Sequence, residues 1–341
     1  MELKITDIHL PLRHPFTIAL GSMTVQHNLL IELTEDGVTG YGECAVGRAY
    51  RASPESMRAS LEAARVAIEA ESVDDPAALW ARLEPVIGQD RFAFCGLDQA
   101  AHDLWGKLQG APVWKLWGQD ISRIPDSDYT IGIAEIDIMV AKMKEFDGWP
   151  IYKIKLGTDR DLEIVRALRQ HTDAVFRIDA NTAWTAEQTI AFAPELKDLG
   201  VEFLEQPLKR DDWEGMKKVK AGCVLPVIAD ESCLTETDVD RCAGIFDGIN
   251  IKLSKAGGLT PGRRMIARAR ELGLKVMVGC MTESTVGISA IAQLLPQLDY
   301  VDMDGAVLIT EDGDIATGVR LDKGRPVFPA DVNGNGVTLV G

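Results

Sequence analysis

Eight short apolar segments recur along residues 128–304, and their even spacing constrains the fold more than any other feature of the chain. Measured between the polar or glycine residues near the end of each segment, successive segments lie 22 to 27 residues apart. That interval fits one strand, one helix and two short loops. Amphipathic stretches such as RDLEIVRALRQ and PGRRMIARARELG fill the intervals. The segments read DYTIGI, IYKIKLG, AVFRIDA, VEFLEQP, PVIADES, GINIKLS, KVMVGCM and LDYVDMD.

Eight strand–helix units in series predict an α/β fold of the (β/α)8 barrel type over residues 123–309. Residues 1–122 instead combine alternating, strand-like runs with long helical stretches. Within them, Glu35-Asp36-Gly37 marks a turn between two strands. We therefore predict an α+β module over residues 1–122. The glycine-rich tail, residues 310–341, is predicted to pack back on that module.

The charge of the chain excludes two classes of partner. Fifty-two acidic residues against 36 basic ones give a net charge of −16. Nucleic acid and anionic membranes both attract basic surfaces, so neither is expected as a partner. The N-terminal residues lack the apolar core of a secretory signal, and no run of 18 apolar residues occurs. The six cysteines form no CxxC pair, which predicts reduced thiols and a cytoplasmic location.

Polar residues stand where the predicted strands end, which is the side of a barrel on which active sites form. Asp179, Glu205 and Asp230 end three consecutive strands, so their carboxylates point into one space. Without a counterion they would repel one another. Oxygen-only ligation favours one Mg²⁺ over Zn²⁺, and no organic cofactor is expected. A helix N-cap is the common role of one strand-end aspartate, but it does not account for three acids in register.

Lysines flank these acids. Lys155 ends the second strand and Lys252 the sixth, so the two should face each other across the barrel. Lys153 and Lys155 share one strand face, and their like charges should lower one pKa towards neutrality, as a general base requires. Structural ion pairs with the carboxylates are the alternative role for all three lysines.

Two opposed bases around one metal ion predict racemisation or epimerisation. The metal would bind a substrate carboxylate, and one lysine would remove the α-proton from one face. The metal would then stabilise the enediolate while the opposite lysine returns a proton to the other face. A one-base variant of such a site would catalyse β-elimination or cycloisomerisation.

These motifs resemble the muconate-lactonizing-enzyme subgroup of the enolase superfamily. The likeness rests on Lys153-Ile-Lys155, the three carboxylates and Lys252 in NIKLSKAGG, and it extends over the whole chain. It implies a modified, enolase-like barrel with an N-terminal α+β capping domain that the C-terminal tail completes. The mandelate racemase subgroup uses a histidine base after the seventh strand and is excluded, because every histidine precedes that point. The histidines are His9, His14, His27, His102 and His171.

The eighth strand ends in Asp302-Met303-Asp304, which is similar to dipeptide epimerases of the L-Ala-D/L-Glu type. In that type the Asp-x-Asp pair holds the ammonium group of the dipeptide, so the resemblance implies a dipeptide whose second residue Lys155 and Lys252 epimerise. A solvated acidic loop is the alternative role of the two aspartates. N-acylamino acid racemase, o-succinylbenzoate synthase and muconate cycloisomerase are the alternative activities in the subgroup. The expected substrate-binding residues are Asp302, Asp304, Thr130, Lys153, Cys280 and Met281.

The loop after Pro15 departs from the Ala-Glu epimerase pattern, because it lacks the arginine that meets the glutamate side chain there. A glutamyl side chain, as in murein peptides, would then need Arg48 or Arg51, which are otherwise surface residues. An uncharged or hydrophobic second residue is the other possibility. The expected specificity residues are Ile18, Leu20, Met23, Arg48 and Arg51.

Two hypotheses of another kind stay open. A Schiff-base aldolase would use a strand lysine as a nucleophile, although the three carboxylates would then have no role. A metal-stabilised binding protein would lose only stability when Lys155 and Lys252 are replaced. A small-molecule dipeptide and further copies of the chain, in a homo-oligomer, are the expected partners.

Overall fold

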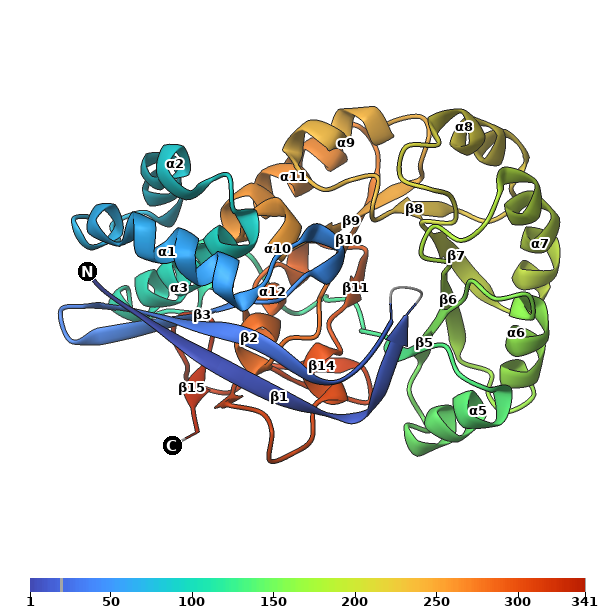
Figure 1. The fold of residues 1–341 in the computed structure, drawn as a ribbon, viewed down its shortest axis with the longest axis horizontal. Coiled ribbons are helices and arrows are strands. Elements are labelled where there is room, and N and C mark those ends of the chain that lie inside the picture. The colour runs from blue at the N-terminus through green and yellow to red at the C-terminus, as the bar shows by residue number, and fades with distance from the viewer. Residues whose placement is uncertain (19–20, 341) are drawn as a thin grey trace.

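Eight parallel strands form the barrel of this computed structural model, which describes residues 1–18 and 21–340, without the side chains of residues 16–21 and 48. The strands follow one another in chain order, and helices surround the sheet (Figure 1). A single bridge between Ser127 and Val301 links the first strand region to the last, so the barrel is nearly closed. The predicted fold class is confirmed, and each of the eight predicted segments contains a strand. The strands are β4 (Tyr129–Ile131), β5 (Ile151–Lys155), β6 (Val175–Asp179), β7 (Val201–Glu205), β8 (Val227–Ala229), β9 (Gly248–Lys252), β10 (Lys275–Gly279) and β11 (Tyr300–Asp302).

The barrel helices bury one apolar stripe against the sheet, as α6 illustrates. Ile164, Val165 and Leu168 of α6 are buried, while acidic residues begin the helix and arginines end it. This charge order complements the helix dipole. The helices are α5 (Ile136–Glu145), α6 (Asp161–Arg169), α7 (Ala186–Asp198), α8 (Trp213–Gly222), α9 (Glu236–Cys242), α10 (Leu253–Ala256), α11 (Leu259–Glu271) and α12 (Thr285–Ala292).

The barrel interior below the strand ends is partly apolar and partly ionic. Its apolar layer comprises Phe203, Ile228, Met277 and Tyr300. At the same level Arg177 is buried and pairs with Asp128 at 2.8 Å and with Glu202 at 2.9 Å. Its guanidinium also lies 5.3 Å from the ring centroid of Phe203. A buried arginine is tolerated here because both its charge and its donors have partners.

The N-terminal module is a three-stranded antiparallel sheet with helices packed against it. The predicted turn at Asp36 and Gly37 is present, with Gly37 at a φ of 76°. Pro54 begins the first helix, and a capping box between Ser53 and Ser56 pairs the free N–H groups at this N-terminus. The elements are β1 (Glu2–Ile18), β2 (Gly21–Glu35), β3 (Val38–Cys44), α1 (Pro54–Glu69), α2 (Pro76–Ile87), α3 (Arg91–Leu108) and α4 (Val113–Leu116).

We expect Gly42→Ala to destabilise the protein by about 2–3 kcal/mol, the upper range for overpacking. A methyl group at Gly42 of β3 would lie 2.0 Å from the carbonyl oxygen of Gly96 in α3, so the two elements would have to separate. Gly110→Ala is the control, because nothing lies within 4 Å of its added methyl group. Only its φ of 68° opposes that change, at about 1 kcal/mol. Urea unfolding measures both, and equal losses would contradict the close approach of β3 to α3.

Two carboxylates of the N-terminal module cap helices of the barrel. Glu43 of β3 accepts hydrogen bonds from the backbone of Ser284 at 3.0 Å and of Gly287 at 3.2 Å, at the start of α12. Asp98 of α3 accepts from the backbone and the hydroxyl of Thr260, both at 2.8 Å, in the first turn of α11. Because anions stabilise helix N-termini, these contacts hold the module over the barrel mouth.

The C-terminal tail lies between the N-terminal sheet and the barrel. Ala316 and Val337 pack in one apolar cluster with Leu10 of β1 and Val286 of α12. The strands of the tail are short. Elsewhere in the chain and unrelated to the tail, all six cysteines are free thiols. Among the described residues, no helix has the length and apolar character needed to cross a membrane. The tail strands are β12 (Ala316–Thr317), β13 (Arg320–Asp322), β14 (Arg325–Val327) and β15 (Thr338–Leu339).

Candidate active site

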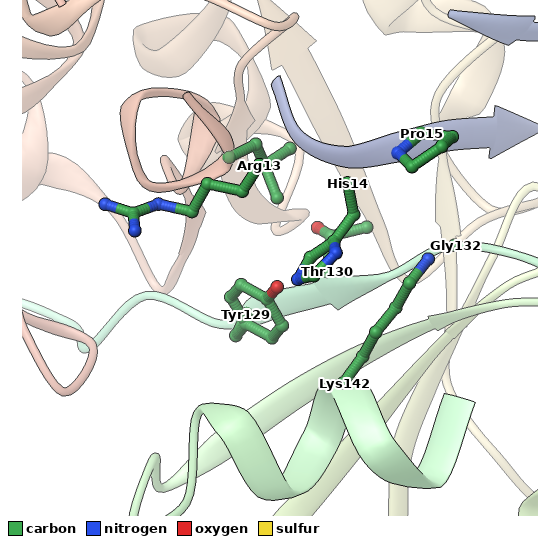
Figure 2. A pocket seen from close by; sticks show the side chains of 8 residues that line it. Arg13, His14, Pro15, Tyr129, Thr130, Gly132 and Lys142 are labelled. Atoms are coloured by element: carbon green, nitrogen blue, oxygen red, sulfur yellow. The ribbon is translucent and has the colours of Figure 1, made fainter. Parts of the chain in front are cut away.

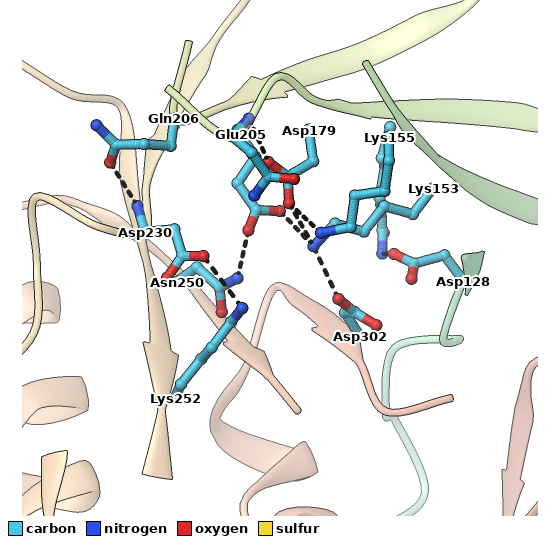
Figure 3. Close-up of polar contacts among 12 residues, drawn as sticks. Asp128, Lys153, Lys155, Asp179, Glu205, Gln206, Asp230, Asn250, Lys252 and Asp302 are labelled. Atoms are coloured by element: carbon cyan, nitrogen blue, oxygen red, sulfur yellow. Dashed lines mark hydrogen bonds and ion pairs between the residues drawn. The ribbon is translucent and has the colours of Figure 1, made fainter. Parts of the chain in front are cut away.

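Three carboxylates meet at the ends of neighbouring barrel strands (Figure 3). Asp179 ends β6, Glu205 ends β7 and Asp230 follows β8, and all three side chains are buried. One oxygen atom from each lies within 4.8 Å of the others. The predicted acidic triad is therefore assembled in space.

The triad suits a hard divalent cation. Its donors are all carboxylate oxygens, the ligand type that Mg²⁺ prefers. Oε2 of Glu205 is buried and accepts no hydrogen bond from the described part of the chain, although Nζ of Lys153 lies 2.8 Å away. Burial and the charge of Asp179 together raise the pKa of Glu205. A cation among the three acids would give Oε2 of Glu205 a partner and would favour the ionised form of its carboxyl group.

Lys155 and Lys252 lie on opposite sides of the barrel, on β5 and β9, with three strands between them. Nζ of Lys155 is 2.5 Å from Asp179, and Nζ of Lys252 is 3.1 Å from Asp230. Both lysines line one cavity of about 670 Å³ that opens between the N-terminal module and the barrel. A substrate in this cavity would have an amine on each side.

The expected lowering of a lysine pKa does not hold for Lys153. Burial acts to lower the pKa of Lys153, but Asp302, Glu205 and Asp179 outweigh it and hold the pKa well above its usual value. The pKa of Lys252 is raised in the same way by Asp230. The prediction considered only the neighbouring lysine, whereas three carboxylates lie 2.8 to 3.3 Å from Nζ of Lys153. Lys252 can act as a base only when positive charge offsets Asp230.

A second acidic pair lies across the cavity, at the end of β11. Oδ2 of Asp302 is 2.8 Å from Nζ of Lys153, while its buried Oδ1 has no hydrogen-bond partner among the described residues. Asp304 accepts a hydrogen bond from the backbone of Thr130 at 2.6 Å. Burial opposes ionisation of Asp302, yet Lys153 lowers its pKa to about 2. Burial and the charge of Asp302 raise the pKa of Asp304.

Most of the predicted substrate-binding residues line the main cavity, the one of about 670 Å³ between the N-terminal module and the barrel. Lys153 lies beneath it and joins the triad to Asp302. A small neighbouring cavity of about 20 Å³ shares Thr130, and Figure 2 shows Lys142 of α5 extending there towards Pro15 of β1. The predicted residues along the main cavity are Thr130, Cys280, Met281, Asp302 and Asp304.

The predicted specificity residues have different outcomes. Met23 of β2 lines the main cavity. Arg51 is exposed and is not part of the cavity wall in the described structure. Leu20 and the side chains of Ile18 and Arg48 lie outside the described residues.

Several polar residues of the site were not predicted. Asn250 donates to Glu205 at 2.8 Å, and Lys255 pairs with Asp230. Glu231 is half-buried, and burial together with the charge of Asp230 raises its pKa to about 7. Asn250 precedes Lys252 by two residues, so the strand period places both on the inner face, a signal that would have found it.

Models of two domain families match the chain. The Mandelate racemase / muconate lactonizing enzyme, N-terminal domain matches residues 1–118, and the Enolase C-terminal domain-like family matches residues 138–340. The L-Ala-D/L-amino acid epimerase of Maribacter sp. is 57% identical over 99% of both chains. The L-Ala-D/L-Glu epimerase of Bacteroides thetaiotaomicron is 37% identical over 100% of this chain and 88% of its own.

A solved structure resembles the whole fold. The dipeptide epimerase of Enterococcus faecalis V583, in complex with Mg and the dipeptide L-Leu-L-Tyr, superposes with a TM-score of 0.92. It is 29% identical, and the match covers 99% of both chains. The chain thus belongs to the mandelate racemase and muconate lactonizing enzyme family of the enolase superfamily.

Proposed function

We propose that the chain is a Mg²⁺-dependent epimerase of dipeptides that inverts the α-carbon of the second residue. The observation that carries this proposal is the position of Lys155 and Lys252 on opposite strands of one cavity, on either side of the carboxylate triad. The relatives named as L-Ala-D/L-amino acid and L-Ala-D/L-Glu epimerases support the same activity.

Each group of the site has a distinct role in this proposal. Asp179, Glu205 and Asp230 hold Mg²⁺, which when bound takes the substrate carboxylate and stabilises the negative charge that deprotonation creates. Lys155 removes or returns the α-proton on one face, and Lys252 does so on the other. Lys153 stays protonated and bridges the triad and Asp302, which fixes the orientation of these carboxylates.

Asp302 and Asp304 select a dipeptide over the other substrates of the family. Oδ1 of Asp302 is buried without a hydrogen-bond partner in the described chain, so an ammonium group would satisfy it. An acylated amine, a muconate or a succinylbenzoate precursor carries no positive charge there. These substrates would leave Oδ1 of Asp302 buried without a hydrogen-bond partner among the described residues.

We expect Asp304→Asn to lower kcat/KM for free dipeptides by about 100-fold, because loss of a buried charged partner costs about 2–5 kcal/mol. The amide oxygen still accepts from Thr130, so the backbone contact survives. N-acetylated dipeptides lack the ammonium group and should react equally slowly with both enzymes. Asp198→Asn, at the exposed C-terminal end of α7 and outside the cavity wall, is the control. An equal loss on free and acetylated substrates would remove Asp304 from ammonium recognition.

The proposed function is tested by screening a dipeptide library in D₂O with Mg²⁺ and detecting α-deuterium by mass spectrometry. Deuterium at the second residue, together with both epimers at equilibrium, is the expected result. N-acylamino acids, muconate and the succinylbenzoate precursor are screened in parallel. Turnover of one of these without any dipeptide reaction would replace the proposal by another activity of the family.

A further inference from the structure

The orientation of a dipeptide between the two lysines follows from the barrel geometry. A carbon that loses a proton beside a carboxylate becomes planar, and its plane lies perpendicular to the line that joins the two bases. That line runs from β5 to β9, so the plane contains the barrel axis and the direction from β7 to β11. The carboxylate points to the triad, which is centred on β7, and the amide nitrogen points to β11.

The third direction in that plane leads out of the barrel, and it is the direction of the second residue's side chain. The cavity wall there is formed by the N-terminal module and by the loop after β7. The module contributes mainly apolar and aromatic surface, with Met23, Val46 and Tyr50. The loop contributes Lys209 and Arg210, both exposed at the outer rim.

These two cations are available to a ligand. No carboxylate of the described chain forms an ion pair with Lys209. Among the described residues, the guanidinium of Arg210 forms an ion pair with Asp211 alone, at 3.5 Å, and the two side chains are 56% and 84% exposed. Such an exposed pair is weak and exchanges partners easily. Glu231, which also lines the cavity, is half-buried beside Asp230 and belongs to the inner part of the site.

We propose that Lys209 and Arg210 form a binding subsite for an anionic side chain on the second residue of the dipeptide. The inference rests on the proposed function. The apolar wall accepts the methylene groups of a glutamyl side chain or an uncharged side chain, and the cationic rim receives a terminal carboxylate. The subsite thereby replaces the arginine that the loop after Pro15 lacks, and it disfavours lysyl and arginyl side chains.

The test compares kcat/KM for L-Ala-L-Glu, its neutral isostere L-Ala-L-Gln and the cationic L-Ala-L-Lys, using the full chain with Mg²⁺. The Glu-to-Gln ratio is kcat/KM for L-Ala-L-Glu divided by kcat/KM for L-Ala-L-Gln, and the Lys-to-Gln ratio is defined in the same way. In the double variant Lys209→Gln/Arg210→Gln, the Glu-to-Gln ratio should fall about tenfold, which corresponds to the loss of two exposed ion pairs. The Lys-to-Gln ratio should rise. In the wild type, added salt should lower the Glu-to-Gln ratio, and in the double variant it should not. A merely structural role would change kcat/KM by the same factor for all three substrates and leave both ratios constant.

Lys218→Gln is the matched control, since Lys218 lies on the adjacent helix α8 and outside the cavity wall. It should leave both ratios at the wild-type value. An unchanged Glu-to-Gln ratio in the double variant, or an equal change in the control, overturns the subsite. Turnover of L-Ala-L-Gln without turnover of L-Ala-L-Glu by the wild type overturns it while the proposed function stands. Absence of reaction with every dipeptide overturns both.

Discussion

Glu205→Gln should abolish Mg²⁺ binding and lower epimerase activity by more than about 100-fold. Even groups that only orient metal ligands cost 10- to 100-fold when they are removed, and Glu205 stands at the centre of the triad. The substitution keeps the size of the side chain but removes its charge. It also removes the like-charge repulsion with Asp179 that raises the pKa of Glu205. The metal-free variant should therefore be at least as stable as the metal-free wild type.

Calorimetric titration and thermal unfolding with and without Mg²⁺ measure this outcome. The wild type should bind Mg²⁺, and its Tm should rise with the Mg²⁺ concentration, since a ligand that binds only the folded state stabilises it. EDTA should remove activity, and added Mg²⁺ should restore it. Glu214→Gln, on the exposed side of α8, should behave as the wild type. A Glu205→Gln protein that still gains stability from Mg²⁺ would contradict the metal site.

Lys155→Ala and Lys252→Ala should each lower the rate of epimerisation by about 10²- to 10⁴-fold, the usual contribution of a general base or acid. Inversion needs one group to remove the proton and another to return it from the opposite face. Loss of either lysine therefore blocks inversion in both directions. Steady-state polarimetry or chiral chromatography measures the rate.

Metal binding separates this loss from a loss of structure. Both variants should keep the Mg²⁺-dependent rise in Tm, because neither lysine is a metal ligand. Lys217→Ala, an exposed residue of α8, is the control for the removal of positive charge. A variant that keeps wild-type epimerisation would remove its lysine from the mechanism. Epimerisation that survives in both variants would assign the proton transfers to groups other than these two lysines.

The strand ends of the barrel were predictable because their signal is local. Each strand is a short apolar run, and a polar residue at its carboxyl end faces the barrel mouth. Asp179, Glu205 and Lys252 follow this rule, so sequence spacing alone brings them together. The strand period of two also relates Lys153 to Lys155.

Contacts between distant segments were not predictable from spacing. Glu43 and Ser284 are 241 residues apart, and no periodicity connects the N-terminal sheet to the start of α12. The rise in the pKa of Lys153 was missed for a similar reason, since one of the acids that cause it, Asp302, is 149 residues away in the sequence and ends β11. Lys209 and Arg210 lie in a loop, where no regular period indicates which side chains face the cavity.

Exchange of the α-proton in D₂O tests the central claim most directly, because it observes each lysine separately. The substrate is the most active dipeptide of the screen, supplied as its L,L and L,D epimers and followed by proton NMR with Mg²⁺. The wild type should exchange the α-proton of both epimers. Lys155→Ala should exchange only one epimer, and Lys252→Ala should exchange only the other, because each remaining lysine faces one side of the carbon. Normal exchange of both epimers by both variants would contradict the two-base mechanism.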